Sequence, residues 1–336
     1  MHKLFGKTDF RVYPMGFGGI PIQRNDENAA ISIVHEAIDR GINFFDSARG
    51  YTDSEHKMGL GVKGFREKII LATKSMSRTS EALEKDINTS LREFGTDYID
   101  LYQCHNVRTV SELETLIGPK GGLEALLKAQ ESGKLRYIGI TIHKPEIAIK
   151  AIAQFPFVSV QFPYNFLEQQ NKSDLITLAK EKELGIIIMK PLAGGAIRRG
   201  DLALRFLLEK DLGVVIPGMD SVEQVRANTE LVNNFSSLSP AELTELEQDV
   251  AGLGENFCRR CEYCMPCPSR IDIPSMFLLE GYHDRYNLPE WAIERYGMSE
   301  INAGACTECG KCESKCPYSL PIREKLKKVH SLLNRS

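Results

Sequence analysis

The segment 69–104, IILATKSMSRTSEALEKDINTSLREFGTDYIDLYQC, contains a complete strand–helix–strand unit. Its first five residues and its last six are apolar runs of the length that buried strands have, and residues 80–94 between them place apolar side chains at helical spacing. A connecting helix of this length carries the chain back to the end where the first strand began, so the two strands are expected to run parallel.

The same alternation of strand and helix continues along most of the chain. A hairpin is expected at the amino terminus, and one further helix at 240–250 follows the last unit. Eight strands that alternate with helices predict a parallel (β/α)8 barrel of the TIM type. The expected strands are 14–18, 43–46, 69–73, 99–104, 137–141, 159–162, 185–189 and 214–216, and the expected helices are 28–40, 80–94, 122–132, 145–153, 173–182, 202–209 and 221–235.

Eight of the nine cysteines form two proline-terminated runs near the carboxyl end of the chain. Three thiolates spaced by two residues bind one iron–sulfur cluster, and a distant Cys-Pro supplies the fourth ligand of the opposite cluster. The spacing therefore predicts two 4Fe-4S clusters in a small ferredoxin-like domain, with exchanged fourth ligands. One cluster is expected to take Cys258, Cys261, Cys264 and Cys316, and the other Cys306, Cys309, Cys312 and Cys267.

Zinc ions and disulfides are the alternative uses of such cysteines. Zinc takes four ligands from two Cys-x-x-Cys pairs, whereas each triplet here is followed by a further Cys-Pro. Disulfides need an oxidising compartment, and the first residues of the chain carry no apolar signal segment. Iron–sulfur clusters are the better interpretation, and we expect a cytoplasmic protein. Cys104, inside an apolar run, is expected to be a small buried core residue.

Length and charge set the remaining limits. The 336 residues suffice for one large domain and one small one. The glycines of Gly252-Leu253-Gly254 suggest a hinge, so the expected domains are a barrel at 1–254 and a dicluster domain at 255–336. A net charge of -3 argues against nucleic acid as the main partner. Since no apolar stretch approaches the length of a membrane span, a soluble protein is expected.

Polar residues at the carboxyl ends of barrel strands are the candidates for catalysis, because active sites of this fold lie there. Asp46 ends the second expected strand, Lys74 follows the third, His105 follows the fourth, and Tyr51 lies in the loop after Asp46. A tyrosine hydroxyl is a poor acid near neutrality, but a nearby ammonium stabilises the phenolate. Lys74 can supply that charge, with Asp46 holding it and His105 orienting a carbonyl group.

Each of these residues also has a simpler role when it is considered alone. Asp46 can cap a turn or helix, Lys74 can be a solvated charge, and His105 can be a satisfied core histidine. Their coincidence at neighbouring strand ends is what favours catalysis.

Three stretches of this chain resemble the aldo-keto reductase family. They are Gly41-Ile42-Asn43-Phe44-Phe45-Asp46-Ser47-Ala48 with Tyr51, Leu71-Ala72-Thr73-Lys74, and Asp97 through His105. The cysteine tail is similar to the ferredoxin-type extension of one prokaryotic branch of that family. The resemblance implies that Asp46, Tyr51, Lys74 and His105 form a catalytic tetrad with Tyr51 as the acid.

The resemblance also implies a nicotinamide coenzyme, either NADP or NAD, bound across the strand ends. Thr141 and Gln161 would contact the nicotinamide carboxamide, and Met189 stands where an aromatic ring often stacks. At the phosphate end the usual cations are replaced by Gly218 and Gln224, which leaves NADH use open unless Arg226 compensates. The full set of expected coenzyme contacts is Gly18, Thr141, Gln161, Met189, Pro191, Leu192, Gly218, Arg226 and Asn228.

Three functional hypotheses follow. In the first, the protein reduces a carbonyl substrate, or oxidises an alcohol, while its clusters exchange electrons with ferredoxin or another electron carrier or assist docking. In the second, the barrel is catalytically idle and the clusters make a redox-responsive interaction protein. In the third, the enzyme is active and its clusters are purely structural. The sequence does not name the substrate, because variable loops shape the pocket of this fold.

Overall fold

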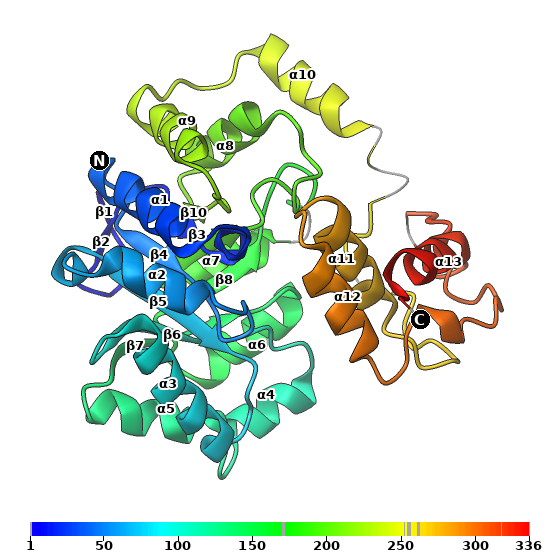
Figure 1. Ribbon diagram of the computed structural model, residues 1–336, viewed down its shortest axis with the longest axis horizontal. Coiled ribbons are helices and arrows are strands. Elements are labelled where there is room, and N and C mark those ends of the chain that lie inside the picture. The colour runs from blue at the N-terminus through cyan, green and yellow to red at the C-terminus, as the bar shows by residue number, and fades with distance from the viewer. Residues whose placement is uncertain are drawn as a thin grey trace. The chain divides into compact units, whose positions relative to one another are not determined.

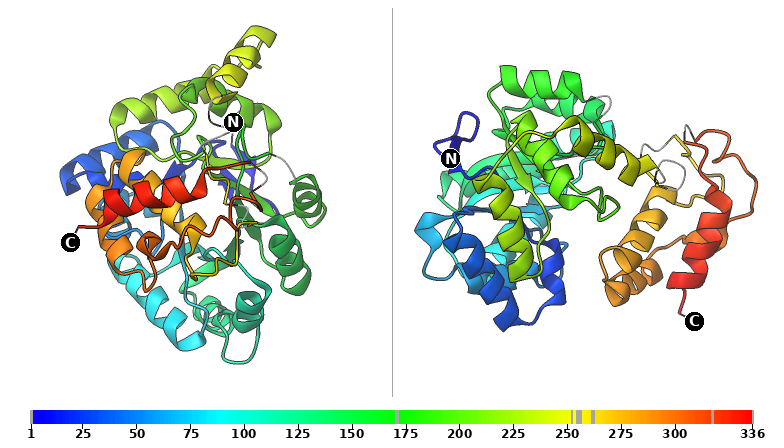
Figure 2. Two further views of the ribbon diagram at one scale, coloured as in Figure 1. Left: turned by 90° about the vertical axis from the view of Figure 1, so that its right-hand side faces the viewer. Right: turned by 90° about the horizontal axis from the view of Figure 1, so that it is seen from above.

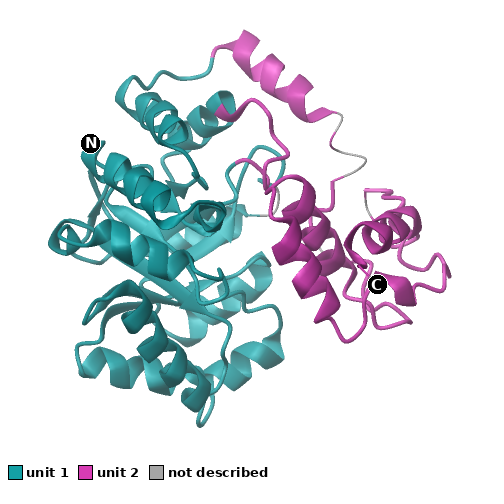
Figure 3. Cartoon of the chain, viewed as in Figure 1, with its two compact units in different colours: residues 1–191, 201–238 teal, residues 192–200, 239–336 magenta. Residues whose placement is uncertain are grey.

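The computed structural model describes residues 2–169, 172–251, 253, 257–260, 263–316 and 318–335. The chain divides into two units (Figure 3). The first unit contains Met1–Pro191 and Asp201–Leu238, and the second contains Leu192–Gly200 and Ser239–Ser336. The division expected between 1–254 and 255–336 remains a prediction, and both glycines of the expected hinge lie outside the described residues.

Within the described residues, the first unit contains one eight-stranded sheet in which every neighbouring pair is parallel. Single parallel bridges from Met15 to Val215 and from Gly18 to Gly218 join the first strand to the last, which closes the barrel. The predicted barrel is thus confirmed. Its strands are β3 (Phe17–Gly18), β4 (Phe44–Asp46), β5 (Ile70–Ser75), β6 (Ile99–Cys104), β7 (Leu135–Thr141), β8 (Ser159–Pro163), β9 (Gly185–Met189) and β10 (Val214–Ile216).

Helices lie around the outside of these strands (Figure 1, Figure 2). Several begin at side-chain caps: Asp26 accepts a hydrogen bond from the Ala29 amide, and Thr79 accepts one from the Ala82 amide. They are α1 (Glu27–Asp39), α2 (Ser54–Val62), α3 (Ser80–Phe94), α4 (Val110–Ile117), α5 (Gly122–Glu131), α6 (Pro145–Gln154), α7 (Ser173–Glu181), α8 (Gly200–Lys210) and α9 (Val222–Asn233).

The sequence did not predict α2 or α4. Helix α2 contains Gly59 and Gly61, which have poor helix propensity. The structure needs both glycines, because a Cβ at Gly59 would lie 2.7 Å from the Phe94 backbone and one at Gly61 would lie 2.6 Å from Val34. Close packing of α2 on its neighbours therefore overrides the local preference.

The amino-terminal end of the barrel is covered by the predicted hairpin, β1 (Lys3–Leu4) and β2 (Arg11–Val12). The hairpin contributes Phe5, Phe10 and Val12 to the core cluster that fills the barrel. In that cluster they pack with barrel-strand residues that include Phe44 and Leu101. The hairpin therefore seals the end of the barrel opposite the carboxyl ends of the strands.

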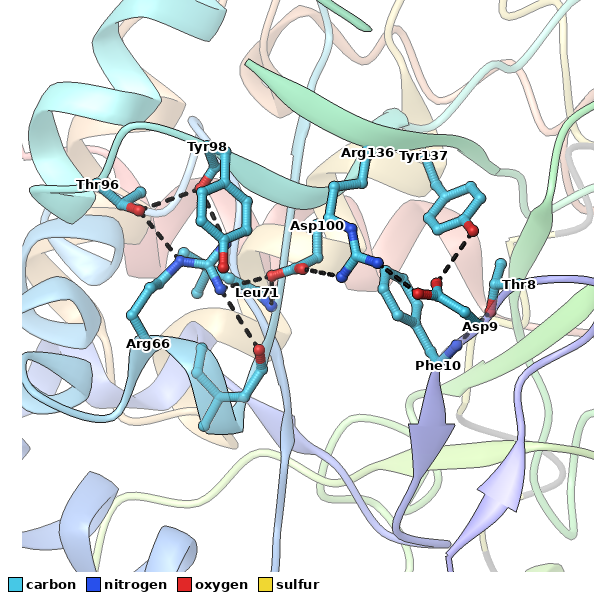
Figure 4. A network of polar contacts seen from close by, with 11 residues as sticks. Thr8, Asp9, Phe10, Arg66, Leu71, Thr96, Tyr98, Asp100, Arg136 and Tyr137 are labelled. Carbon is cyan, nitrogen blue, oxygen red and sulfur yellow. Dashed lines mark hydrogen bonds and ion pairs between the residues drawn. The ribbon is translucent and has the colours of Figure 1, made fainter. Parts of the chain in front are cut away.

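A network of ion pairs links the hairpin to the starts of the strands (Figure 4). Asp100 is only 1% exposed, and its two oxygens pair with Arg66 at 2.7 Å and Arg136 at 3.1 Å. Arg136 also pairs with Asp9 of the hairpin loop at 2.6 Å. This network is a structural feature of the barrel, remote from the strand ends where catalysis is expected.

The second unit contains α10 (Pro240–Ala251), α11 (Ile273–Asp284), α12 (Pro289–Gly297) and α13 (Ile322–Leu333). A small core includes Ile271, Phe277, Tyr296 and Val329, and cysteines of both runs pack against it. Among the described residues, no helix is long and apolar enough to cross a membrane.

The β9–α8 loop, residues 192–200, also belongs to the second unit. The backbone amides of Arg198 and Arg199 donate to Asp249 of α10, at 2.8 and 3.0 Å, and Arg285 after α11 donates to the Gly194 carbonyl at 3.2 Å. This loop is therefore held by α10 and by the end of α11.

Candidate active site and cluster cavities

Asp46 and Lys74 form a buried ion pair at the carboxyl ends of β4 and β5. The Lys74 ammonium lies 2.5 Å from Asp46 Oδ2 and donates to the Ser47 carbonyl at 2.7 Å. Lys74 was expected just after its strand, but β5 continues to Ser75 because Lys74 and Ser75 both pair with β6. The backbone of Lys74 is thus part of the sheet, and its ammonium is held by Asp46 and Ser47.

Tyr51 and His105 complete the predicted group. The Lys74 ammonium lies 5.1 Å from the centre of the Tyr51 ring, and the ring of His105 stands perpendicular to that of Tyr51 at 6.1 Å between centres. The backbone of His105 is held by β5, since its amide donates to the Ser75 carbonyl at 2.8 Å. The structure therefore brings all four expected catalytic residues together.

Burial controls the charges at this site. Burial raises the pKa of the Asp46 carboxyl and lowers the pKa of the Lys74 ammonium, while the attraction between the two groups opposes both changes. The pKa of His105 lies well below its ordinary value because the ring is buried and because Lys74, Arg78 and Lys190 are nearby cations. His105 is therefore neutral near pH 7, with one ring N–H available as a donor.

Three supporting residues were not predicted. Gln103, a polar residue within β6, donates to Asp46 Oδ1 at 3.1 Å. Arg78 donates to the His105 carbonyl at 2.8 Å. Glu55, only 2% exposed, accepts hydrogen bonds from Thr73 at 2.6 Å and from Ser90 at 2.8 Å, and it pairs with Arg49 in the Tyr51 loop.

Only one of these residues had a local signal in the sequence. Gln103 is one of two polar residues, with Asp100, in a mostly apolar run, whereas the partners of Arg78 and Glu55 come from other segments of the chain. The sequence gives no indication of those distant contacts.

Thr141 and Gln161 lie at the ends of the neighbouring strands β7 and β8, and both are 1% exposed. The Thr141 hydroxyl accepts a hydrogen bond from the Asn106 amide at 2.7 Å. Gln161 hydrogen-bonds to Asp46, and within the described residues its Oε1 has no partner. A buried carbonyl oxygen without a donor costs stability unless a ligand supplies one. The pair therefore fits a ligand amide such as a carboxamide.

The residues expected near coenzyme phosphates are distributed around β10 and α9. Gly218 follows β10 and is bridged to Gly18, and a Cβ on Gly218 would lie 2.5 Å from Pro21. Arg226 on α9 binds Glu36 of α1 through two hydrogen bonds, at 2.8 and 3.1 Å. Asn228 is partly buried on α9.

The remaining expected coenzyme contacts lie along β9 and the segment that follows it. Met189 ends β9, and Pro191 is the last residue of this stretch in the first unit. Leu192 begins the loop that belongs to the second unit.

Two cavities in the second unit are lined by cysteines. Cys267 from the first run lines one cavity together with Cys306, Cys309 and Cys312. Cys316 from the second run lines the other together with Cys258 and Cys264. Cys261 lies outside the described residues. Among the described residues, no three His, Cys, Asp or Glu side chains are grouped so as to hold a single metal ion.

Cys104 is buried in β6 as expected, with 1% of its surface exposed. Burial raises the pKa of its thiol to about 12, so it is an unreactive core residue. None of the cysteines that the structure describes forms a disulfide bond.

Comparison with known proteins identifies both parts of the chain. Residues 14–201 match the model of the aldo/keto reductase family, and residues 257–321 match that of a 4Fe-4S dicluster domain. The chain therefore belongs to the aldo-keto reductase family and carries a carboxy-terminal 4Fe-4S dicluster domain. It is an oxidoreductase of that family.

Individual relatives agree with this classification. L-galactose dehydrogenase of Arabidopsis thaliana is 28% identical over 287 residues, which is 70% of this chain and 89% of the relative. A probable aldo-keto reductase of Glycine max is 30% identical over 56% of this chain and 59% of its own length. The solved aldo-keto reductase AKR11C1 of Bacillus halodurans, in its holo form, is 25% identical with a TM-score of 0.63, covering 74% of this chain and 95% of that one.

Proposed function

We propose that the barrel transfers hydride between NAD(P)H and a small carbonyl or alcohol substrate, with Tyr51 as the general acid. The observation that carries this proposal is the Lys74 ammonium, held 2.5 Å from Asp46 and 5.1 Å from the centre of the Tyr51 ring. A buried cation beside a tyrosine favours the phenolate that remains after proton donation. A nicotinamide coenzyme, when bound, supplies the hydride.

The other residues have distinct tasks in this proposal. Neutral His105 donates its ring N–H to the carbonyl oxygen and so directs that oxygen toward the Tyr51 hydroxyl. Asp46 keeps Lys74 charged and in place. Gln161 offers its unpaired Oε1, and Thr141 its hydroxyl, to the nicotinamide carboxamide. A solved aldo-keto reductase from Klebsiella pneumoniae was crystallised with NADPH, which supports NADP as one coenzyme of this chain.

We propose further that the two cysteine cavities hold two 4Fe-4S clusters with exchanged fourth ligands. Each cavity draws a cysteine from the opposite run, the arrangement that the spacing predicts. The clusters, when bound, supply one-electron transfer. Cys309 is solvent-exposed, which gives a carrier such as ferredoxin a place to exchange electrons. Reduced thiolate ligands suit a cytoplasmic location.

The test of the barrel's function uses anaerobically purified full-length protein. Coenzyme oxidation is followed with a panel of aldehydes and ketones, for the wild type and for Lys74→Met. Coenzyme-dependent product formation that Lys74→Met abolishes is expected. Equal turnover by both proteins would refute the site, and coenzyme binding without turnover of any carbonyl would favour the idle barrel.

The test of the clusters is separate. Electron paramagnetic resonance follows the clusters during incubation with NADPH, NADH or reduced ferredoxin, with and without a carbonyl substrate. A change of oxidation state under any of these conditions is expected. Clusters that never change state while carbonyl reduction proceeds would make a structural role the better assignment.

A further inference from the structure

Each of the two cysteine cavities is lined by one arginine, and the two arginines differ in their contacts. Each contains one arginine: Arg259 in the cavity of Cys258, Cys264 and Cys316, and Arg323 in the other. Ile273 lines both cavities. With such similar linings, clusters bound in the two cavities would have similar reduction potentials unless the two arginines affect them differently.

Arg323 is neutralised by Glu313. Its Nε donates to Glu313 Oε2 at 2.8 Å, its Nη2 lies 2.7 Å from the same oxygen, and its backbone amide donates to Oε1 at 2.9 Å. The pair also holds the start of α13. A guanidinium bound this closely to a carboxylate adds little net charge to the cavity beside it.

Arg259 has no such partner within the described residues. Its guanidinium stacks on the ring of Tyr318, 4.0 Å from the ring centre, and within the described part of the chain no carboxylate pairs with it. Its Nε is buried and has no hydrogen-bond acceptor among the described residues. A buried N–H donor without an acceptor is costly. In a cavity lined by three cysteines, the acceptors that a bound cluster would bring are thiolate and sulfide sulfurs.

We propose that Arg259 is a tuning residue that selectively raises the reduction potential of the cluster bound by Cys258, Cys264 and Cys316. The inference rests on the proposed binding of two clusters. Reduction adds one electron, and so one negative charge, to a cluster. An uncompensated cation and an N–H donor to sulfur stabilise that reduced form, since net charge and hydrogen bonds to sulfur are among the determinants of cluster potential. Arg323 lacks the net charge to do the same.

The consequence is a direction for electrons within the second unit. An external one-electron donor loses one electron and the exposed Cys309 cluster accepts it. The more readily reduced Arg259 cluster then takes that electron from its neighbour. The Arg259 cluster therefore serves as the electron-holding end of the pair.

The test is a redox titration of the anaerobically purified full-length protein. Clusters are reduced stepwise with dithionite and mediators and followed by electron paramagnetic resonance, without coenzyme, carbonyl substrate or protein carrier. The variants are Arg259→Gln, which loses the charge, Arg259→Lys, which retains it, and, as the matched control, the double variant Arg323→Gln with Glu313→Gln, which removes an arginine together with its carboxylate. Iron and sulfide are measured in each preparation.

Arg259→Gln is expected to shift one midpoint to a more negative potential and to leave the other unchanged. The expected shift corresponds to about a tenfold change in the electron-exchange equilibrium, or about 59 mV for one electron. Arg259→Lys should shift that midpoint less, and the double variant Arg323→Gln with Glu313→Gln should leave both in place. If Arg259→Gln loses its clusters, Tyr318→Leu, which removes the stacking surface, is expected to lower the same midpoint.

Unchanged midpoints in Arg259→Gln with full iron content would overturn the inference. Equal shifts of both clusters, or an equal shift in the double variant Arg323→Gln with Glu313→Gln, would overturn it as well. Wild-type protein that binds no iron would overturn the proposed clusters themselves. Absence of carbonyl reduction would not alter these midpoints, so the two proposals fail separately.

Discussion

Arg226 on α9 is bound to Glu36 on α1 through two hydrogen bonds, at 2.8 and 3.1 Å. These contacts and those from Arg40 hold the pKa of the Glu36 carboxyl down at about 2, so the carboxylate is charged throughout the working pH range. Arg226 is the cation whose compensation for Gly218 and Gln224 at a coenzyme 2'-phosphate the sequence left open. In this structure its guanidinium is already engaged.

We therefore predict weak discrimination between NADPH and NADH. Glu36→Gln should release Arg226 and strengthen NADPH binding relative to NADH, because a free guanidinium binds phosphate well. Dissociation constants for both coenzymes, measured by fluorescence titration, check this. The double variant Glu36→Gln with Arg226→Ala should lose the gain. A strong wild-type preference for NADPH that survives Arg226→Ala would contradict this interpretation.

Tyr51→Phe removes the proposed proton donor and keeps the ring. Turnover of a substrate shown to use this site should fall by about 10²–10⁴-fold, the usual contribution of a general acid. Coenzyme binding should be spared. Tyr137→Phe is the matched control, since that hydroxyl donates to Asp9 in the hairpin network. Unchanged turnover in Tyr51→Phe would rule out Tyr51 as the acid.

The lowered pKa of His105 predicts how stability depends on pH. Below the unfolded-state pKa of about 6.5 the unfolded chain binds a proton that folded His105 does not, so acidification favours unfolding. Stability contributed by neutral His105 is thus present above about pH 6.5 and is lost as pH falls below it. Urea unfolding between pH 5 and pH 8 should show a shallower acid slope for His105→Asn than for the wild type. Identical slopes would show that His105 titrates normally when folded.

Asp100 supplies a stability prediction at the other end of the barrel. Asp100→Ala leaves Arg66 and Arg136 without their buried counter-charge and should lower the free energy of unfolding by about 3 kcal/mol. Asp9→Ala removes an exposed partner of Arg136 and should cost less than about 1 kcal/mol. Urea midpoints for both variants provide the measurement. Equal losses in the free energy of unfolding would mean that the burial of Asp100 does not strengthen its ion pairs.

The proposed exchange of fourth ligands between two clusters can be tested by single substitutions. Cys267→Ser should damage the cluster of Cys306, Cys309 and Cys312, and Cys316→Ser should damage that of Cys258 and Cys264. The double variant Cys267→Ser with Arg259→Gln then assigns the remaining signal: if that signal comes from the cluster beside Arg259, its midpoint should be shifted. Cys104→Ser, in the barrel, should retain full iron content. The wiring is wrong if each substitution damages the cluster of its own run.

Local sequence was sufficient for much of this structure. Buried parallel strands are continuous apolar runs, so all eight barrel strands were recognisable, and the polar residues at or just after their carboxyl ends included Asp46, Lys74 and His105. Helix α2 was missed because Gly59 and Gly61 meet a packing requirement of distant neighbours. The Arg226–Glu36 pair and the contacts of Glu55 join segments far apart in the chain, and no local pattern encodes them.

The contacts of residues 192–200 have a consequence for dissecting this protein. The chain passes between the two units after residues 191, 200 and 238, so a single cut does not separate them. A shortened chain that ends at Leu238 would keep loop 192–200 but lack Asp249 and Arg285, which hold it. That loop follows directly from Met189 and Pro191, two of the expected coenzyme contacts. Truncation of the iron–sulfur part would therefore release a loop that directly follows two of the proposed coenzyme contacts, and the shortened chain is expected to differ in activity from the barrel in the whole chain.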